Sequence, residues 1–391
     1  SLTVNIDNFT DADIPNLVGS LKKLNTLTLV DEKKAGTNWA PTAHTVANLN
    51  LTAVAKKTLS TLNIARTGIT IEDNAFKVVA ANNEFINLTS ISLPEGLTAI
   101  GKNAFDGFKG TTITIPSTVT TIDDAAFKGA ALTGTTFATI ASGANAGKVN
   151  LATIGANAFE NCASIASVSI PALVAGTLSL GADAFKACTS LASATFGSAV
   201  ELGGTAFKGC TSLATVTISG ATTSIGNDAF KGCTALTSLD LSKANITTAL
   251  NAPFTGCTAL TSVTLNNKVT TLAANLFKDT KIEEIKAEGA TSVGLIMGVP
   301  TAEKPNTTLK KVTLGPVDDM ATLTFQYCQA LEEVTIAFDV ATMTAADVIP
   351  TKAFYYCTAL KTFNFSPENA TAKYVNDNAF LGCSSSPLVN F

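Results

Sequence analysis

The chain has little charge and almost no histidine, and both shortages narrow the functions it can perform. Charged residues make up 14% of its 391 positions, the formal net charge is -4, and His44 is the single histidine. Lysine and arginine form no run that could follow a phosphate backbone, so we expect no nucleic-acid partner. No stretch reaches the roughly 18 apolar residues of a bilayer-spanning helix, so we expect no membrane span in the visible chain.

The side chains that catalysis and metal binding need are also scarce. A histidine-dependent triad would have to use His44, which has no nucleophile elbow near it. The acidic pairs Glu283–Glu284 and Glu332–Glu333 are adjacent on expected strands, so their side chains should point to opposite faces. The residues from Asn5 to Asp13 offer acids and amides for calcium but lack the glycine and terminal glutamate of a known calcium loop. We therefore expect no enzyme, no cofactor and no bound metal.

One repeated phrase organises most of the chain. Its clearest copies read IGNDAFKGCTALTSLDLS at 225–242 and LGGTAFKGCTSLATVTIS at 202–219. Most copies place their phenylalanine, the anchor, 22 to 32 residues after the previous one. The anchors are Phe76, Phe105, Phe127, Phe159, Phe185, Phe207, Phe230, Phe254, Phe277, Phe325, Phe354 and Phe380. The gap of 48 residues after Phe277 holds a degenerate copy with Met297 at the anchor, which makes thirteen units in all.

Each column of the repeat predicts a position in the fold. An aliphatic residue five positions before the anchor and an alanine directly before it should face inward, as with Ile225 and Ala229. Asparagine or aspartate two positions before the anchor, such as Asp228, is typical of a helix cap, and glycines such as Gly232 follow as helix breakers. We therefore expect a single helical turn around each anchor. The alternation of Leu236–Leu241 predicts a short half-buried strand.

These units predict a repeat solenoid. A strand and one helical turn cannot bury their own apolar faces, so each unit is stable only between neighbours. Stacking should give a right-handed curved rod, with a parallel sheet of short strands on one face. The phenylalanine and leucine columns should fill its interior.

The phrase I-G-x-x-A-F-x-x-C-x-x-L-x-x-V-x-I recurs over about residues 71 to 383, and it resembles the BspA-like class of leucine-rich-repeat bacterial surface proteins. It differs from the commoner leucine-rich repeat because its cysteine follows the phenylalanine rather than the strand. The resemblance implies an arc-shaped solenoid of leucine-rich-repeat type, a secreted or cell-surface location on a host-associated microbe, and a role in adhesion. It implies no particular ligand and no site residue.

The first 70 residues are predicted to form a separate N-terminal cap. They lack the repeated phrase but keep two strand-like fragments, Leu24–Leu29 and Leu59–Ile64, and the ends of a solenoid must cover its open core. Residues 71–391 should form the solenoid. Insertions near 79–87, 138–150, 298–306 and 337–350 should emerge as loops. A solenoid tolerates such loops at little cost, but loops are also where ligand contacts accumulate.

All eight cysteines lie three residues after an anchor. Val79, Phe108 and Ala130 occupy the same column, so the position favours a small or apolar group, and we interpret the thiols as buried hydrophobes. Stacked units bring neighbouring thiols within reach of a disulfide, but their parallel Cβ vectors would give poor disulfide geometry. Zinc is not expected, because the sequence has no C-x-x-C.

A column of lysines follows the anchors directly. Its members are Lys77, Lys128, Lys186, Lys208, Lys231 and Lys278. One interpretation is a solvated row that prevents aggregation, and the other is a basic rail for an anionic polymer. The negative net charge of the chain favours the first interpretation.

The resemblance also implies that the exposed side chains of the strands contact the partner. The predicted ligand-binding residues are Asp240, Thr264, Glu284, Lys286, Lys311, Thr313 and Thr335. This row is rich in hydroxyl groups and has no aromatic residue, so binding should use a wide area rather than one strong contact. The expected partner is an extracellular protein or a glycan. The alternative is a structural stalk or a self-associating component of the cell envelope.

Overall fold

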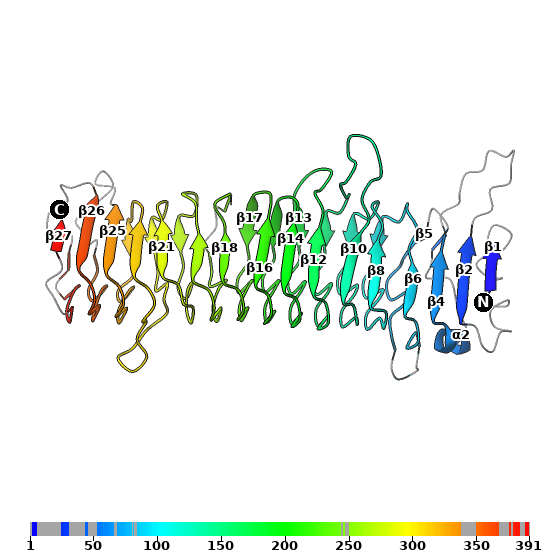
Figure 1. Ribbon diagram of the computed structural model, residues 1–391, viewed down its shortest axis with the longest axis horizontal. Coiled ribbons are helices and arrows are strands. Elements are labelled where there is room, and N and C mark those ends of the chain that lie inside the picture. Colours follow the sequence, from blue (N-terminus) through cyan, green and yellow to red (C-terminus); the bar gives the residue numbers. More distant parts are fainter. Residues whose placement is uncertain are drawn as a thin grey trace. The chain divides into compact units, whose positions relative to one another are not determined.

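The computed structural model describes residues 2–5, 25–30, 44–45, 53–65, 69–79, 81, 84–243, 245–246, 250–337, 349–366, 375–376, 378–383 and 388–390. The chain divides into two compact units, unit 1 (Ser1–Glu201) and unit 2 (Leu202–Phe391). Each is built from short parallel strands, and α2 (Ala53–Thr58) is the one α-helix among these residues (Figure 1). The predicted repeat solenoid is thereby confirmed. The cap boundary at residue 70 and the number of thirteen units stay predictions.

The strands of unit 1 stack in parallel ladders. They are β1 (Leu2–Asn5), β2 (Thr26–Val30), β3 (His44–Thr45), β4 (Thr61–Ile64), β5 (Ile69–Thr70), β6 (Ser90–Ser92), β7 (Ala99–Ile100), β8 (Thr112–Ile115), β9 (Thr121–Ile122), β10 (Gly134–Phe137), β11 (Thr153–Ile154), β12 (Ser167–Ile170), β13 (Leu178–Leu180) and β14 (Ser193–Phe196). The ladders are β1-β2-β4-β6, β8-β10-β12-β14, β7-β9-β11-β13 and β3-β5. The two predicted N-terminal fragments are confirmed as β2 and β4, in which Leu27 pairs with Leu62.

Unit 2 repeats the same arrangement. After β15 (Val200–Leu202), at the boundary of the units, come β16 (Thr215–Ile218), β17 (Thr222–Ile225), β18 (Ser238–Asp240), β19 (Ser262–Thr264), β20 (Thr271–Leu272), β21 (Glu284–Ala287), β22 (Ser292–Val293), β23 (Lys311–Leu314), β24 (Asp319–Met320), β25 (Glu333–Ala337), β26 (Thr362–Ser366) and β27 (Leu388–Asn390). Parallel ladders join β18-β19, β20-β22-β24 and β21-β23-β25-β26-β27. The predicted alternation is confirmed in β21, where Ile285 and Ala287 are buried between exposed neighbours.

The anchor phenylalanines form the core that the repeat predicts. In unit 1 the rings of Phe159 and Phe185 stack with centroids 5.0 Å apart and planes inclined by 2°. In unit 2 Phe230 and Phe254 stack at 6.0 Å, and both are fully buried. The degenerate copy also follows the pattern, since Met297 is only 5% exposed. Each unit therefore rests on a continuous apolar column, and stacked rings add to the stability gained from burial.

The segment around each anchor differs from the expected helical turn. Asn103 lies two positions before Phe105 and has φ 54°, and Gly107 lies two positions after it with φ 75°. Two hydrogen bonds of 2.7 Å join this segment to the next repeat. The N–H of Phe105 donates to the carbonyl of Ala126, and the N–H of Gly107 donates to the carbonyl of Lys128. The positive φ values at these two positions exclude a right-handed helical turn, and the N–H groups between them bond to the next repeat instead. Asparagine and aspartate serve here as residues that tolerate left-handed backbone rather than as helix caps.

The cysteines are free thiols, and all but the half-buried Cys383 are buried, as predicted. They also hydrogen bond, which the apolar interpretation did not include. The Sγ of Cys233 donates to the carbonyl of Phe207 at 3.1 Å, and that of Cys257 donates to Phe230 at 3.1 Å. Burial raises the pKa of Cys257 to about 12. These hydrogen bonds join neighbouring repeats, and burial disfavours the thiolate, which is the reactive form of cysteine.

Several predicted loops are present, and others lie outside the described residues. The 138–150 insertion turns back on itself through a hydrogen bond from the N–H of Ile140 to the carbonyl of Lys148 (2.9 Å). The 298–306 insertion projects as the long yellow loop at the lower edge of Figure 1. Most of the 337–350 insertion and the acids proposed for calcium lie outside the described residues. The backbone of His44 pairs with Ile69 in the β3-β5 ladder.

Candidate binding surfaces

The seven predicted ligand-binding residues all lie on strands β18, β19, β21, β23 and β25 of unit 2, whose outward-facing surface is the strand face. Asp240 and Thr264 end β18 and β19, where they are paired in register. The remaining five lie on β21, β23 and β25, in two parallel rows. One row runs from Glu284 to Lys311, and the other runs from Lys286 through Thr313 and Thr335. The structure thus brings the predicted residues onto one face, whereas their role in binding stays a prediction.

A groove interrupts this face between β19 and β21. The N–H of Glu283 donates to the carbonyl of Thr261 (3.2 Å) just before both strands begin, and the strands then belong to different ladders. The separation leaves a cavity of about 470 Å³. Its lining residues are Thr261, Ser262, Val263, Thr264, Leu265, Glu283, Glu284 and Lys286. The expected continuous sheet is therefore divided, and three of the predicted site residues line the division.

The predicted orientation of the two carboxylates of this groove was wrong. Glu283 and Glu284 were expected on opposite faces, yet both are exposed and both line the groove. The reason is that β21 begins at Glu284, so Glu283 precedes the strand and does not follow its alternation. The buried position is taken by Ile282, which is fully buried. The same holds for Glu332, which is exposed and precedes β25.

Most charges on the strand face are already paired. Glu283 binds Lys310 at 2.9 Å, and Lys311 binds Glu333 at 3.2 Å. Lys286 contacts Glu288 at 3.2 Å. The backbone N–H of Ser242 donates to the carboxylate of Asp240 at 2.8 Å, and this bond lowers the pKa of Asp240. Exposed ion pairs of this kind add little stability, but they leave the face close to neutral and hydroxyl-rich.

The lysine column is not a continuous basic rail. Lys77 pairs with Asp106 at 3.0 Å, and Lys128 pairs with Glu160 at 2.7 Å. Lys231 and Lys186 each pair with an aspartate three residues earlier in the same repeat. Within the described residues, Lys208 and Lys278 make no ion pair. The four paired lysines support the interpretation of the column as a solvated row, and Lys208 and Lys278 depart from the pairing.

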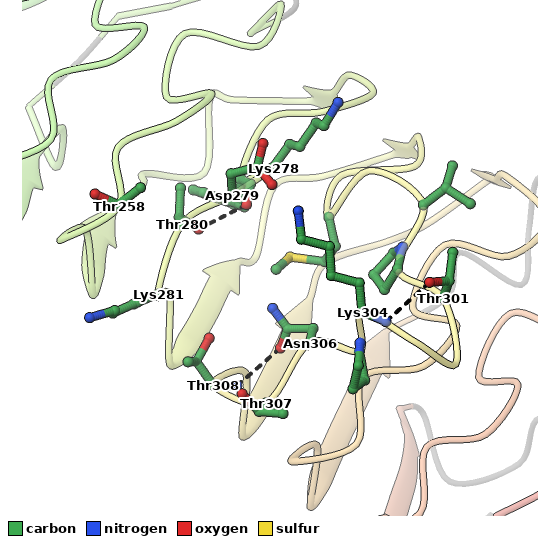
Figure 2. A pocket seen from close by; sticks show the side chains of 15 residues that line it. Thr258, Lys278, Asp279, Thr280, Lys281, Thr301, Lys304, Asn306, Thr307 and Thr308 are labelled. Carbon is green, nitrogen blue, oxygen red and sulfur yellow. Dashed lines mark hydrogen bonds between the residues drawn. The ribbon is translucent and has the colours of Figure 1, made fainter.

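Lys278 lines a second cavity, at the edge where the anchor turns lie. This turn-edge pocket has a volume of about 480 Å³ and forms between the turn after Phe277 and the 298–306 loop (Figure 2). Its charged lining residues are Lys278, Asp279, Lys281 and Lys304. Within the part of the chain that the structure describes, none of these four makes an ion pair. The pocket is therefore positively charged on a chain whose net charge is -4.

Three tyrosines form a partly exposed cluster next to this pocket. The rings of Tyr327 and Tyr356 stack at 5.4 Å, and Tyr355 meets Tyr356 edge to face at 4.6 Å. The amine of Lys352 lies 5.1 Å from the centroid of the Tyr355 ring. Desolvation raises the pKa of Tyr327, with smaller contributions from Tyr355. Sequence reasoning missed this cluster, although three of the four tyrosines occupy the two positions directly after an anchor.

The described residues contain no group of three or more histidine, cysteine or acidic side chains placed to hold a metal ion. None of their helices has the length and apolar character needed to cross a membrane. Among the described residues of unit 2, the groove and the turn-edge pocket are two candidate sites.

Comparison with known proteins identifies the repeat. The family model described as BspA type leucine rich repeat region matches residues 47–191, 178–294 and 305–391, in six copies. No curated protein matches the chain.

Several solved structures match this chain at low sequence identity. A leucine-rich repeat protein from Bacteroides ovatus has 18% identity and a TM-score of 0.41, over 79% of this chain and 84% of that one. The pneumococcal vaccine antigen PcpA has 17% identity and a TM-score of 0.41, over 85% and 80%. A leucine rich cell surface protein from Faecalibacterium prausnitzii has 17% identity and a TM-score of 0.34, over 72% and 88%. These values place no ligand on the chain, whereas the family model spans most of it, and the chain belongs to the BspA-type leucine-rich repeat family.

Proposed function

We propose that this chain is a non-enzymatic scaffold, secreted or exposed at the cell surface, that adheres to an extracellular protein through the strand face of unit 2. Membership of the BspA-type leucine-rich repeat family supports a protein-binding repeat scaffold. The observation that carries the choice of face is the groove between β19 and β21, because it is the concave part of an exposed row. It is lined by unpaired Glu284 beside hydroxyl groups, which suits hydrogen bonding to a polar protein surface.

Binding by this face should be spread over many weak contacts. The row contains no tyrosine, tryptophan or arginine, the residue types that most often dominate protein interfaces. An interface of standard size buries about 800 Å² on each partner, so the partner has to cover several neighbouring strands. Parallel pairing holds Glu284, Lys286 and their neighbours in fixed register, which reduces the entropy lost on binding.

A charge-reversed variant tests the face directly. The four changes Asp240→Lys, Glu284→Lys, Lys286→Glu and Lys311→Glu invert the pattern of the row without altering the net charge. Wild-type and variant chains are compared on arrays of immobilised extracellular matrix proteins. We expect the variant to lose at least tenfold in affinity for any protein that the wild type binds, with unchanged thermal stability.

The control exchanges an ion pair outside the face. Lys77→Glu with Asp106→Lys alters two charges in unit 1 and should leave binding unchanged. Retained affinity in the four-residue variant would contradict the assignment. Concentration-dependent self-association of the wild type, with no binding to any matrix protein, would instead favour a structural stalk or envelope component.

A further inference from the structure

The turn-edge pocket is held open by an ordered loop. Within the loop, Thr301 and Lys304 exchange backbone hydrogen bonds, each at 3.2 Å. The N–H of Asn306 donates to the carbonyl of Tyr327 at 2.9 Å, and the side-chain oxygen of Asn306 accepts from the N–H of Thr308 at 3.2 Å. The loop is thus tied at its tip and at its base, so the pocket exists before any ligand arrives, which lowers the entropic cost of binding.

Lys278 faces a glycine where two repeats of unit 1 have an acid. In those repeats the lysine after the anchor pairs with the acid after the next anchor, Lys77 with Asp106 and Lys128 with Glu160. The residue after the next anchor here is Gly298, which has no side chain. A Cβ placed on Gly298 would lie 3.1 Å from Cγ of Lys278, so the lysine stem packs directly over the glycine. Its amine therefore remains available for an external anion.

The second amine comes from the loop. Lys304 extends from the loop toward the turn that carries Lys278 and Asp279, whereas Lys281 points the other way (Figure 2). The single carboxylate, on Asp279, offsets one of the three positive charges and leaves the lining with an excess of two. Lysine amines at the rim of a concave site attract anions and orient them by charge rather than by a fixed fork geometry.

The rest of the lining suits a hydroxylated ring. Within the described residues, the hydroxyl groups of Thr258 and Thr307 make no hydrogen bond, so both can donate or accept. Val299 is 58% exposed and supplies an apolar wall. The backbone bond from Asn306 to Tyr327 places the tyrosine cluster beside the pocket, and Tyr356 in that cluster is 41% exposed. Sugars combine hydroxyl groups with apolar C–H faces that pack against such side chains.

We infer that the turn-edge pocket binds an acidic saccharide, with its carboxylate or sulfate between the amines of Lys278 and Lys304. The sugar hydroxyls hydrogen bond to Thr258 and Thr307, and neighbouring sugar units extend over the tyrosine cluster. The volume of about 480 Å³ lies in the range of small-molecule sites. This site is separate from the strand face, so it stands or falls independently of the proposed protein-binding function.

Calorimetric titration with three matched probes tests the inference: sialyllactose, sulfated lactose and neutral lactose. We expect at least one acidic probe to bind at least tenfold more tightly than lactose at low ionic strength, and the one that binds more tightly identifies the preferred anion. Higher salt should weaken this binding because the contacts are ionic. Equal affinity for lactose, or no binding of either acidic probe at millimolar concentration, would overturn the inference.

Matched variants locate the site. Lys278→Gln with Lys304→Gln should reduce the affinity for the bound acidic probe at least tenfold. The control Lys208→Gln with Lys243→Gln removes two lysines elsewhere in unit 2, the half-buried Lys208 from the same column and the exposed Lys243, and should change affinity less than twofold. The charge-reversed strand-face variant should bind the probe as the wild type does. Unchanged affinity in the Lys278/Lys304 variant, with both variants folded by circular dichroism, would show that the acidic probe binds elsewhere.

Discussion

The two cavities of unit 2 have nearly the same volume, about 470 Å³ for the strand groove and about 480 Å³ for the turn-edge pocket, but opposite charge. The groove is lined by two glutamates and one lysine, and the pocket is lined by three lysines and one aspartate. Neighbouring segments supply both cavities. Residues 261–265, Glu283, Glu284 and Lys286 line the groove, and residues 277–281 line the pocket.

The difference shows how one repeat can present two unlike surfaces. On the strand face, register places opposite charges side by side, so Lys311 and Glu333 neutralise each other. At the turn edge, two pairs of unit 1 join residues that follow successive anchors, and Gly298 offers Lys278 no partner of this kind. The charge of Lys278 is therefore added to those of the other two lysines that line the pocket.

The largest effect should come from removing the core beneath the pocket. Phe277 lines the turn-edge pocket, is 1% exposed and stacks on Phe254 at 6.0 Å. Phe277→Ala should cost about 3 to 5 kcal/mol of unfolding free energy, because a large buried ring is deleted. Urea denaturation measures the loss, and the acidic probe should no longer bind.

Phe230→Ala is the matched control, since Phe230 is equally buried but lines neither cavity. It should cost a similar free energy while folded chains keep both binding activities. A loss below about 1 kcal/mol in either variant would contradict an interior phenylalanine column.

The anchors illustrate what the sequence could predict. Their recurrence with alanine before and cysteine after is a periodic signal, and periodicity is what stacking requires, so the solenoid and its core were predictable. The anchor turns were not, because Asn103 and its equivalents are equally suited to a helix cap and to left-handed backbone. Which of the two conformations forms depends on hydrogen bonds between neighbouring repeats, and the sequence of a single repeat does not reveal these bonds.

The candidate sites were predictable only in part. The strand row follows from alternation, and its predicted members do lie on one face. The groove depends on two ladders ending between β19 and β21, and the face of Glu283 depends on where β21 begins. The pocket requires Gly298 and Lys278, which belong to neighbouring repeats, to lie in contact although they are twenty residues apart in sequence. Such meetings follow from three-dimensional register and not from local pattern.

Alkaline pH should destabilise the fold and so limit the pH range in which binding to the two cavities can be compared. The pKa of Cys257 rises from 9.0 to about 12 on burial. Its folded value exceeds its unfolded value, so the stability it contributes is present below pH 9 and is lost as pH rises toward 12. Between pH 9 and 12, each such thiol should lower the free energy of unfolding by about 1.4 kcal/mol per pH unit.

Cys257→Ala provides the check. Urea unfolding at pH 8, 9.5 and 10.5 should give a shallower decline for the variant than for the wild type, by about 1.4 kcal/mol per pH unit. Equal slopes would mean that Cys257 is accessible to solvent in the folded chain.

A more selective effect should follow from restoring an acid beside Lys278. Gly298 has φ +74°, a conformation that asparagine and aspartate tolerate better than most residues. Gly298→Asp places a carboxylate where two repeats of unit 1 have one, so it should pair with Lys278 and weaken binding of the acidic probe about tenfold, or about 1.4 kcal/mol.

Gly298→Asn is nearly identical in shape but neutral, so it separates charge from crowding. It should weaken the probe less than threefold, and neither variant should affect the strand face. Equal losses in the two variants would show that steric contact with the Lys278 stem, rather than its free amine, determines binding.

The smallest effect should come from single changes on the strand face. Thr264 borders the groove and ends the exposed row of β19, yet it offers only one hydroxyl and one methyl group to a partner. Thr264→Ala should therefore cost a protein partner less than about 0.5 kcal/mol, since binding energy spread over an area without an aromatic anchor is small at each position. Surface plasmon resonance against the protein partner would measure it, with Lys278→Gln as a variant of the other cavity. A loss above about 2 kcal/mol from Thr264→Ala alone would identify a hot spot in the groove. The groove would then act as a specific pocket, and the contrast with the turn-edge pocket would lie in charge alone and not in how binding energy is distributed.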